Sequence, residues 1–355
     1  MDLDTARRTP SRAALSCLVS ALIVVGTAAV FLAVAADAPD LTALKQDYRR
    51  PSKIPFPAEN PYSDAKTTLG QTLFFDPRLS GPGTMSCATC HNPTFGWEDG
   101  LAVGVGHNAK KLRRATPTVL NLAWAELLMW DGSKDGLEDQ ATGPMENQAE
   151  MDKPIDALVA ELAGFPGYRR LFRAAFGSEA ISRLTIAQAL ATFERTLVSN
   201  RAPFDRWIDG DDAAIGADAQ RGFVLFTGKA NCAVCHTGWR FTDDGFHDVG
   251  LASDDLGRGE KMPDVPPLQH AFKTPTLRNI GARAPYMHDG SLRTLRDVVK
   301  HYNDGFLERE SLSAEMHRLD LSAAEIDDLV AFMLTLTSRD DAVVVPELPT
   351  TEQGL

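Results

Sequence analysis

Two short stretches, Cys87-Ala88-Thr89-Cys90-His91 and Cys232-Ala233-Val234-Cys235-His236, share the pattern Cys-x-x-Cys-His. This pattern is the attachment site of a c-type haem. The two cysteines form thioethers with the porphyrin vinyl groups, and the following histidine is placed to ligate the iron. Zinc is the alternative, but a structural zinc site needs four ligands at related spacings. The sequence therefore predicts two covalently bound haem c groups, attached through Cys87, Cys90, Cys232 and Cys235 and ligated by His91 and His236.

The remaining cysteine, Cys17, lies in a leader and leaves no pair for a disulfide framework. Residues 13–36 are apolar and uncharged, and three arginines precede them. This is the arrangement of a secretory signal peptide, and the stretch is also long enough to span a bilayer as an anchor. Residues 1–36 are therefore predicted to be a signal peptide or signal anchor that directs the rest of the chain to the periplasm.

The net charge of the chain and the positions of its prolines give two further expectations. A formal net charge of −12 repels phosphate backbones, which argues against a nucleic-acid partner. Residues 37–63 contain several prolines and are predicted to form an extended arm. Residues 343–355 are predicted to form a polar tail. The segment between them is long enough for two modest domains.

Several segments occur twice, which indicates an internal duplication. The second haem motif follows the first by 145 residues. Residues 116–121 (TPTVLN) and 129–133 (MWDGS) are each echoed 158 residues later, as residues 274–279 (TPTLRN) and 287–291 (MHDGS). At an offset of 139, the sequence repeats Leu190, Phe193, Thr196, Leu197 and Ser199 as Leu329, Phe332, Thr335, Leu336 and Ser338. Repetition on this scale means two copies of one unit.

The repeated unit is predicted to be helical. Residues 185–199 and 322–338 place apolar side chains at the spacing of an amphipathic helix. Sustained strand alternation is missing from the sequence. The fold class is therefore mostly α, with two cytochrome c-like domains over residues 64–203 and 204–342.

The two copies differ above the haem. Residues 294–302 read as a helix that begins at a capping threonine and places Tyr302 on its apolar side. A buried phenol needs a polar partner, which an iron would provide, although a packed core tyrosine has the same spacing. The equivalent position in the first unit is Pro144, which has no side-chain ligand. The first iron is therefore predicted to be open and reactive, and the second to be ligated by Tyr302.

Three residues near the predicted open site could serve the reaction. Cleavage of a peroxide O–O bond needs a proton moved between its oxygens, and a carboxylate such as Glu150 can move it. Gln140 lies one helical turn before Pro144. Trp130 aligns with His288 and could relay electrons between the haems. For Glu150 a solvated surface position, and for Trp130 a place in the core, are the alternatives.

Together these residues resemble the bacterial dihaem cytochrome c peroxidase and MauG superfamily over essentially the whole chain after the leader. The resemblance rests on the two haem motifs and on residues 115–118, 130–132, 137–141, 143–144, 147–151 and 272–279. It implies that Gln140 and Glu150 line the peroxide pocket of the first haem. It also implies that Trp130 lies between the haems.

The superfamily divides at the distal ligand of the second haem, which is methionine in peroxidases that draw electrons from small cytochromes and tyrosine in MauG-type enzymes. Tyr302 aligns with this position, and Met316 is the nearest alternative thioether. Tyrosinate favours ferric and higher oxidation states, whereas a thioether raises the potential. His107 stands where the peroxidases carry a histidine that caps the resting first haem. Ala115 replaces an asparagine ligand of the family's calcium ion, which leaves a calcium site in doubt.

The resemblance therefore implies a MauG-like oxidase. Its oxidant is hydrogen peroxide or oxygen, and its substrate is a partner protein. In the type member the partner is the methylamine dehydrogenase precursor, in which tryptophan tryptophylquinone (TTQ) is formed. One alternative is a cytochrome c peroxidase that takes electrons from a small redox protein, and another is a dihaem electron carrier without enzymatic activity.

Overall fold

The computed structural model describes residues 41–351, which are mostly helical as the sequence predicts. The α-helices are α1 Leu41–Asp47, α2 Asp64–Phe74, α3 Cys87–Cys90, α4 Gly136–Gln140, α5 Gly143–Glu146, α6 Ile155–Ala163, α7 Pro166–Phe176, α8 Arg183–Thr196, α9 Pro203–Ile208, α10 Ala217–Thr227, α11 Leu295–Lys300 and α12 Ala323–Leu334. The strands form two antiparallel pairs, β1 Leu127–Leu128 with β2 Lys134–Asp135 and β3 Phe246–His247 with β4 Phe272–Lys273. The predicted leader lies outside the described residues.

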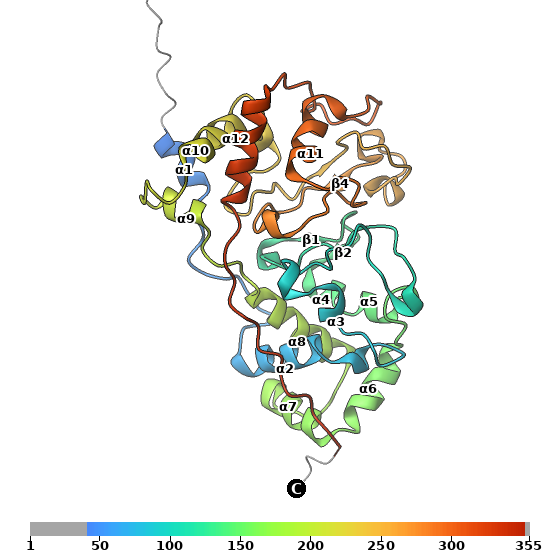
Figure 1. Cartoon of the computed structure of the whole chain (residues 1–355). Coiled ribbons are helices and arrows are strands. Elements are labelled where there is room, and N and C mark those ends of the chain that lie inside the picture. The colour runs from blue at the N-terminus through green and yellow to red at the C-terminus, as the bar shows by residue number, and fades with distance from the viewer. Residues whose placement is uncertain (1–40, 352–355) are drawn as a thin grey trace, which may run out of the picture. The chain divides into compact units, whose positions relative to one another are not determined.

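Each domain is built around one pair of helices, α2 with α8 in the first domain and α10 with α12 in the second (Figure 1). Both pairs need a glycine at the crossing. A Cβ on Gly70 would lie 2.0 Å from the carbonyl oxygen of Ala189, and a Cβ on Gly222 would lie 2.0 Å from that of Asp328. Backbones can approach this closely only where a side chain is missing. The same requirement in both domains confirms the duplication at the level of packing.

A second repeated feature is a hydrogen bond that joins the segment after each haem motif to the residues that follow α8 or α12. Asn121 and Asn279 both adopt left-handed backbone conformations, with φ of 63° and 59°. Each side-chain oxygen accepts a hydrogen bond from a serine backbone N–H, Ser199 at 3.1 Å and Ser338 at 2.9 Å. Asparagine tolerates this backbone region and can bond locally. The repeated Asn and Ser residues therefore place equivalent loops over equivalent helices.

The contact between the two domains is also reciprocal. The backbone N–H of Ala115 donates to the carbonyl oxygen of His288 at 2.7 Å. The backbone N–H of Lys273, the equivalent of Ala115, donates to the carbonyl oxygen of Trp130 at 2.8 Å. Because Trp130 is itself the equivalent of His288, each domain makes the same bond to the other. Trp130 is therefore held at the interface by its own backbone.

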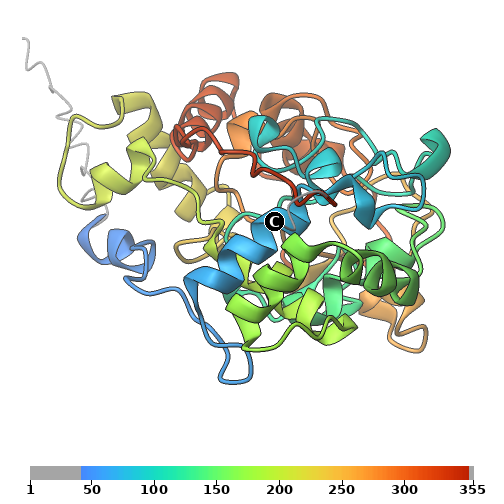
Figure 2. The ribbon, with the colours of Figure 1, turned by 90° about the horizontal axis from the view of Figure 1, so that it is seen from below.

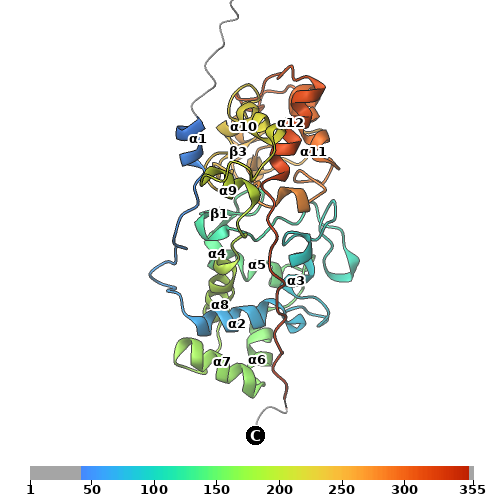
Figure 3. The same ribbon diagram turned by 60° about the vertical axis from the view of Figure 1, so that its left-hand side comes forward.

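The ends of the chain cross over between the domains. The segment predicted to be an extended arm contains α1, and Tyr48 after it is 3% exposed within the aromatic core of the second domain. At the other end, the carbonyl oxygens of Val344 and Pro349 accept hydrogen bonds from Gln71 and Arg78 of the first domain. Figures 2 and 3 show this C-terminal segment passing α2. The segment that precedes the first domain thus packs on the second domain, and the segment that follows the second domain packs on the first.

Within residues 41–351, none of the helices has the length and apolar character needed to cross a membrane.

Candidate haem sites

Both haem motifs fold into one helical turn with the same backbone bond. The N–H of His91 donates to the carbonyl oxygen of Cys87, and the N–H of His236 donates to that of Cys232, each at 2.9 Å. All four motif cysteines are free of disulfides. A turn of this kind brings two sulfur atoms and an imidazole to one side of the chain, as covalent haem attachment requires.

Each motif histidine is prepared to act as an iron ligand. The Nδ1 atom of His91 lies 3.2 Å from the carbonyl oxygen of Trp97, and that of His236 lies 2.8 Å from the carbonyl oxygen of Phe241. Burial lowers the pKa of both imidazoles, so they are neutral. In a neutral imidazole whose Nδ1–H donates, Nε2 keeps its lone pair for a metal.

A cavity adjoins each of these histidines. The first encloses about 780 Å³ of empty space and the second about 1430 Å³, open mouths included. Their walls are equivalent: Val119, Leu122, Met129 and Gln140 line the first, and Leu277, Ile280, Met287 and Val298, each 158 residues later, line the second. Largely apolar walls and a free imidazole fit haem c at both sites. The motif cysteines line the second cavity, and at the first they belong to the turn that carries His91.

Tyr302 lines the same cavity as His236. It lies in the π-helical turn His301–Gly305, which continues α11 and ends near a glycine. Such turns are frequent at functional sites. Burial raises the pKa of Tyr302, so an anionic phenolate there needs a neighbouring cation. A ferric iron would supply that cation. Met316 lines this cavity too, so both predicted donors are within reach of the second site.

The first domain offers no donor at the position equivalent to Tyr302. That position is Pro144, the second residue of α5, which follows α4 just as the π-helical turn follows α11. Gln140 at the end of α4 lines the first cavity together with His91. The first cavity thus has the amide of Gln140 in its wall, whereas Pro144, the counterpart of Tyr302, does not line it.

Glu150 lies next to this region and is partly buried. Its Oε1 accepts a hydrogen bond from Asn147 Nδ2 at 2.8 Å, and burial raises its pKa. It acts electrostatically on Cys90, which places it beside the first motif.

His107 is bonded to the same segment, because its backbone N–H donates a 2.7 Å hydrogen bond to the carbonyl oxygen of Glu150. Among the described residues the buried Nδ1 of His107 has no hydrogen-bond partner, and its Nε2 lies 3.6 Å from Asp152. Neither Glu150 nor His107 is among the side chains that line the first cavity.

Trp130 lines both cavities. Its indole N–H donates to the carbonyl oxygen of Ala115 at 2.8 Å, and its ring meets that of His288 edge-on, with centroids 6.4 Å apart. A carbonyl oxygen is not a base that could remove the indole proton. The position and the hydrogen bond suit an aromatic group that passes electrons between two sites while keeping its proton.

The second domain completes the first cavity with cations, which our sequence analysis missed. Arg240, Lys273 and Arg283 all line it. Arg283 is 4% exposed and pairs with Glu98 at 3.0 Å across the interface. Burial raises the pKa of Glu98 to about 7, with Arg283 acting in the opposite direction. Because these residues come together only when the domains pack, spacing along the sequence carried no signal for them.

The comparisons with known proteins agree with this geometry. A family model described as di-haem cytochrome c peroxidase matches residues 64–213, and a cytochrome c model matches residues 219–337. The methylamine utilization protein MauG of Methylorubrum extorquens is 54% identical over 87% of this chain and 89% of the relative. This chain belongs to the di-haem cytochrome c peroxidase family.

Within the family the chain is MauG-like. MauG of Methylophilus methylotrophus is 50% identical over 86% of this chain and 92% of the relative. The cytochrome-c peroxidase IdrP1 of Denitromonas iodatirespirans is more distant, at 35% identity over 85% of this chain and 89% of the relative. A solved structure titled as a MauG-like protein associated with microbial copper homeostasis superposes with a TM-score of 0.75 and 33% identity, over 81% of this chain and 94% of that one. The protein is therefore a haem-dependent oxidoreductase with two haem c groups and peroxidase-like chemistry.

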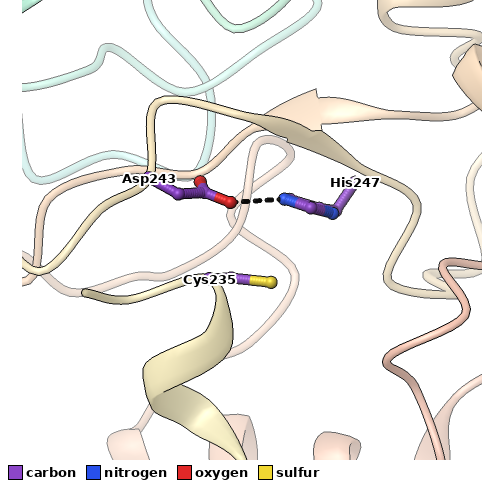
Figure 4. A group of neighbouring side chains, drawn as sticks. All are labelled: Cys235, Asp243 and His247. Carbon is purple, nitrogen blue, oxygen red and sulfur yellow. Dashed lines mark hydrogen bonds and ion pairs between the residues drawn. The ribbon is translucent and has the colours of Figure 1, made fainter.

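Family membership also explains a cluster that resembles a metal site. Cys235, Asp243 and His247 bring possible ligand atoms within 4.8 Å of one another (Figure 4). Asp243 Oδ2 lies 2.8 Å from His247 Nε2, and this hydrogen bond, which does not depend on the Cys235 thiol, raises the pKa of His247. In a haem-bound member of this family the sulfur of Cys235 is a thioether. The cluster is therefore an ion pair at the edge of the second haem site.

Proposed function

We propose that this MauG-like protein uses peroxide-level oxidation to modify a partner protein, the methylamine dehydrogenase precursor, in which it completes TTQ. The observation that carries the proposal is the pairing of Tyr302 with His236 in one cavity, while Pro144 occupies the equivalent position in the first domain. A phenolate donor suits a centre that stores oxidising power, and an open site suits one that reacts with the oxidant. The name shared by the 50–54% identical relatives supports the methylamine pathway.

The residues around the first site manage protons. When bound, haem c supplies an iron that reacts with peroxide or oxygen and exchanges electrons. The carboxylate of Glu150 can take a proton from the inner oxygen of a peroxide and return it to the outer oxygen, because its raised pKa brings it closer to neutral pH. Asn147 holds that carboxylate by the 2.8 Å hydrogen bond, just outside the first cavity, and Gln140 presents its amide to the cavity itself.

Electrons then have to come from a macromolecule that cannot enter either cavity. Trp130 offers a route between the two sites because its ring lines both walls. The partner is accordingly oxidised at a distance, from the surface of the protein. We place the reaction in the periplasm, because the arginine-rich apolar leader predicts export. A calcium ion near Ala115 would have to be bound by backbone oxygens, because alanine has no side-chain ligand. The carbonyl oxygen of Ala115 already accepts a hydrogen bond from the indole N–H of Trp130.

A cytochrome c peroxidase is the second candidate, and two observations favour it. Met316 lines the second cavity and could replace Tyr302 as the ligand. His107 lies beside Glu150, outside the lining of the first cavity, and its Nδ1 atom has no partner within residues 41–351, which leaves a ring nitrogen for a ligand role. Such an enzyme would reduce hydrogen peroxide with electrons from a small redox protein.

One experiment separates the two. The purified dihaem protein receives hydrogen peroxide together with either the methylamine dehydrogenase precursor or a reduced small cytochrome. The oxidase proposal predicts TTQ absorbance in the precursor and slow oxidation of the cytochrome. Rapid cytochrome oxidation with an unchanged precursor would instead establish the peroxidase.

A further inference from the structure

A buried glutamate of the first domain has no role in the chemistry described above. Glu194 lies on α8, is 5% exposed, and has an Oε2 atom without a hydrogen-bond partner in residues 41–351. It stands four residues after Leu190 and seven after Ala187, so it points into the apolar core with them. An unpaired carboxyl group in such a core costs free energy that an apolar side chain would not.

The position of Glu194 relative to the first haem follows from the duplication. Leu190 and Leu329 are equivalent at an offset of 139 residues, and the same offset pairs Glu194 with Met333. Met333 and Leu329 line the second cavity together with Cys232. The repeat therefore assigns Glu194 to the corresponding side of the first haem site, although Glu194 is not among the side chains that line the first cavity. Its electrostatic effect on the sulfur of Cys87 independently shows this closeness.

Haem attachment would not give Glu194 a partner. The thioether bonds join the vinyl-bearing edge of the porphyrin, and the propionates lie on the opposite edge. A haem attached through Cys87 would therefore offer Glu194 hydrocarbon and sulfur, and no hydrogen-bond donor. The carboxyl group stays unpaired next to a centre whose charge changes with each electron.

The charged groups around Glu194 bond other partners. Arg195, its neighbour on α8, forms a bidentate ion pair with Glu138 of α4, with distances of 2.6 and 2.8 Å. Lys66 of α2 bonds Asn60 and the carbonyl of Pro61 instead of Glu194. Burial thus dominates and raises the pKa of Glu194 to about 8, although Arg195 acts in the opposite direction. The group is a neutral acid that a nearby positive charge can ionise.

We propose that Glu194 is a redox-linked proton site of the first haem. Its carboxyl group releases one proton to solvent when the haem loses one electron to the oxidant, and it takes one proton up when an electron returns. The charge of this low-dielectric region then stays constant, which lowers the electrostatic cost of each change of oxidation state. Met333, the counterpart of Glu194 in the second domain, has no ionisable proton, so this proton site is specific to the first haem. The proposal rests on the first haem and not on the identity of the partner protein.

The test is a redox titration of the first haem at several pH values between 6 and 9, with Glu194→Gln against the wild type. In the wild type the midpoint potential should fall as pH rises, by up to about 59 mV per unit for one proton per electron. In Glu194→Gln it should be flat and stay near the low-pH value of the wild type. Glu194→Asp should keep a slope. The matched control is Glu146→Gln, because Glu146 is an exposed glutamate of the same domain and should leave the slope unchanged.

The same slope in Glu194→Gln as in the wild type would overturn the proposal, and so would a flat wild type. If Glu194→Gln fails to bind haem, reduced-minus-oxidised infrared spectra of the wild type provide the test. They should contain the carbonyl band of a protonated carboxyl group that changes with the first haem, and its absence would also overturn the proposal. Failure to oxidise any partner protein would leave both measurements intact.

Discussion

The two haem cavities of this protein are built from equivalent segments, and their surroundings differ at a few residues that bear on the chemistry. The motif turns, the histidine hydrogen bonds and the apolar walls recur in both domains. The differences are Pro144 against Tyr302, Trp130 against His288 and Glu194 against Met333. These differences give the first site an open position, a redox-active ring and an acid, and the second site a ligand, an imidazole and an apolar side chain. A duplicated electron carrier thus becomes an enzyme through a few substitutions around an unchanged frame.

Removing the donor of the second site should have the largest effect on this comparison. Tyr302→Phe keeps the ring and deletes the oxygen, so both sites would then lack a distal ligand. We expect oxidation of the partner protein to fall by more than about 10²-fold, the loss expected when a group needed only for the reaction is removed. Steady-state assays with peroxide and the partner measure it. Tyr286→Phe is the control, because Tyr286 lines the same cavity but its hydroxyl bonds only the carbonyl of Ile280.

Glu150→Gln tests the proton chemistry assigned to the first site. We expect the reaction with peroxide to slow by about 10²- to 10⁴-fold, the usual contribution of a positioned acid–base group. In the wild type the rate should rise with pH as the carboxylate forms, and burial places this rise above the ordinary pKa of a glutamate. The variant should lack the rise. Stopped-flow mixing with peroxide measures both, and equal rates in Glu150→Gln and the exposed-site control Glu146→Gln would remove Glu150 from the mechanism.

The ion pair between Glu98 and Arg283 exists only at the first site. Thr242 takes the place of Glu98, because the residues just before them, Phe241 and Trp97, contact the equivalent histidines, and Ala125 takes the place of Arg283 at the offset of 158 residues. Arg283→Met leaves a buried carboxyl group alone, which should lower the free energy of unfolding by about 3–5 kcal/mol. Denaturant titration of the haem-bound protein measures this change. Adding Glu98→Gln should recover part of the loss. Additive effects in the double variant would mean that the pair has no coupling.

Trp130→Phe should have a smaller effect that falls on one step only. We expect partner oxidation to slow by roughly tenfold, about 1.4 kcal/mol in activation free energy, while the reaction with peroxide stays unchanged. Trp124→Phe is a matched control, since Trp124 packs against Trp239 from the other domain at a centroid distance of 4.7 Å but lines neither cavity. Equal effects of the two variants would contradict a special role for Trp130.

Local patterns and repeats made much of the fold predictable. The haem motifs, the closing helices and the alignment of Tyr302 with Pro144 all depend on residues close in sequence or on a constant offset. The crossing of α1 and the C-terminal segment to the opposite domains depends on contacts over more than 150 residues, such as Arg78 with Pro349, and left no local pattern. The place of Arg283 in the wall of the first cavity also depends on contacts between residues far apart in the sequence, so no local pattern predicted it. Glu194 was visible in principle, because a charged residue aligned with Met333 in the repeat, but its burial required the packed structure.

The central claim is that the two haem sites are unequal, with the first open and the second closed by Tyr302. Electron paramagnetic resonance of the resting ferric protein tests it most directly. The account predicts one high-spin signal from the first haem and one low-spin signal from the second. Two low-spin signals, accompanied by the near-infrared charge-transfer band of a methionine-ligated haem, would contradict it.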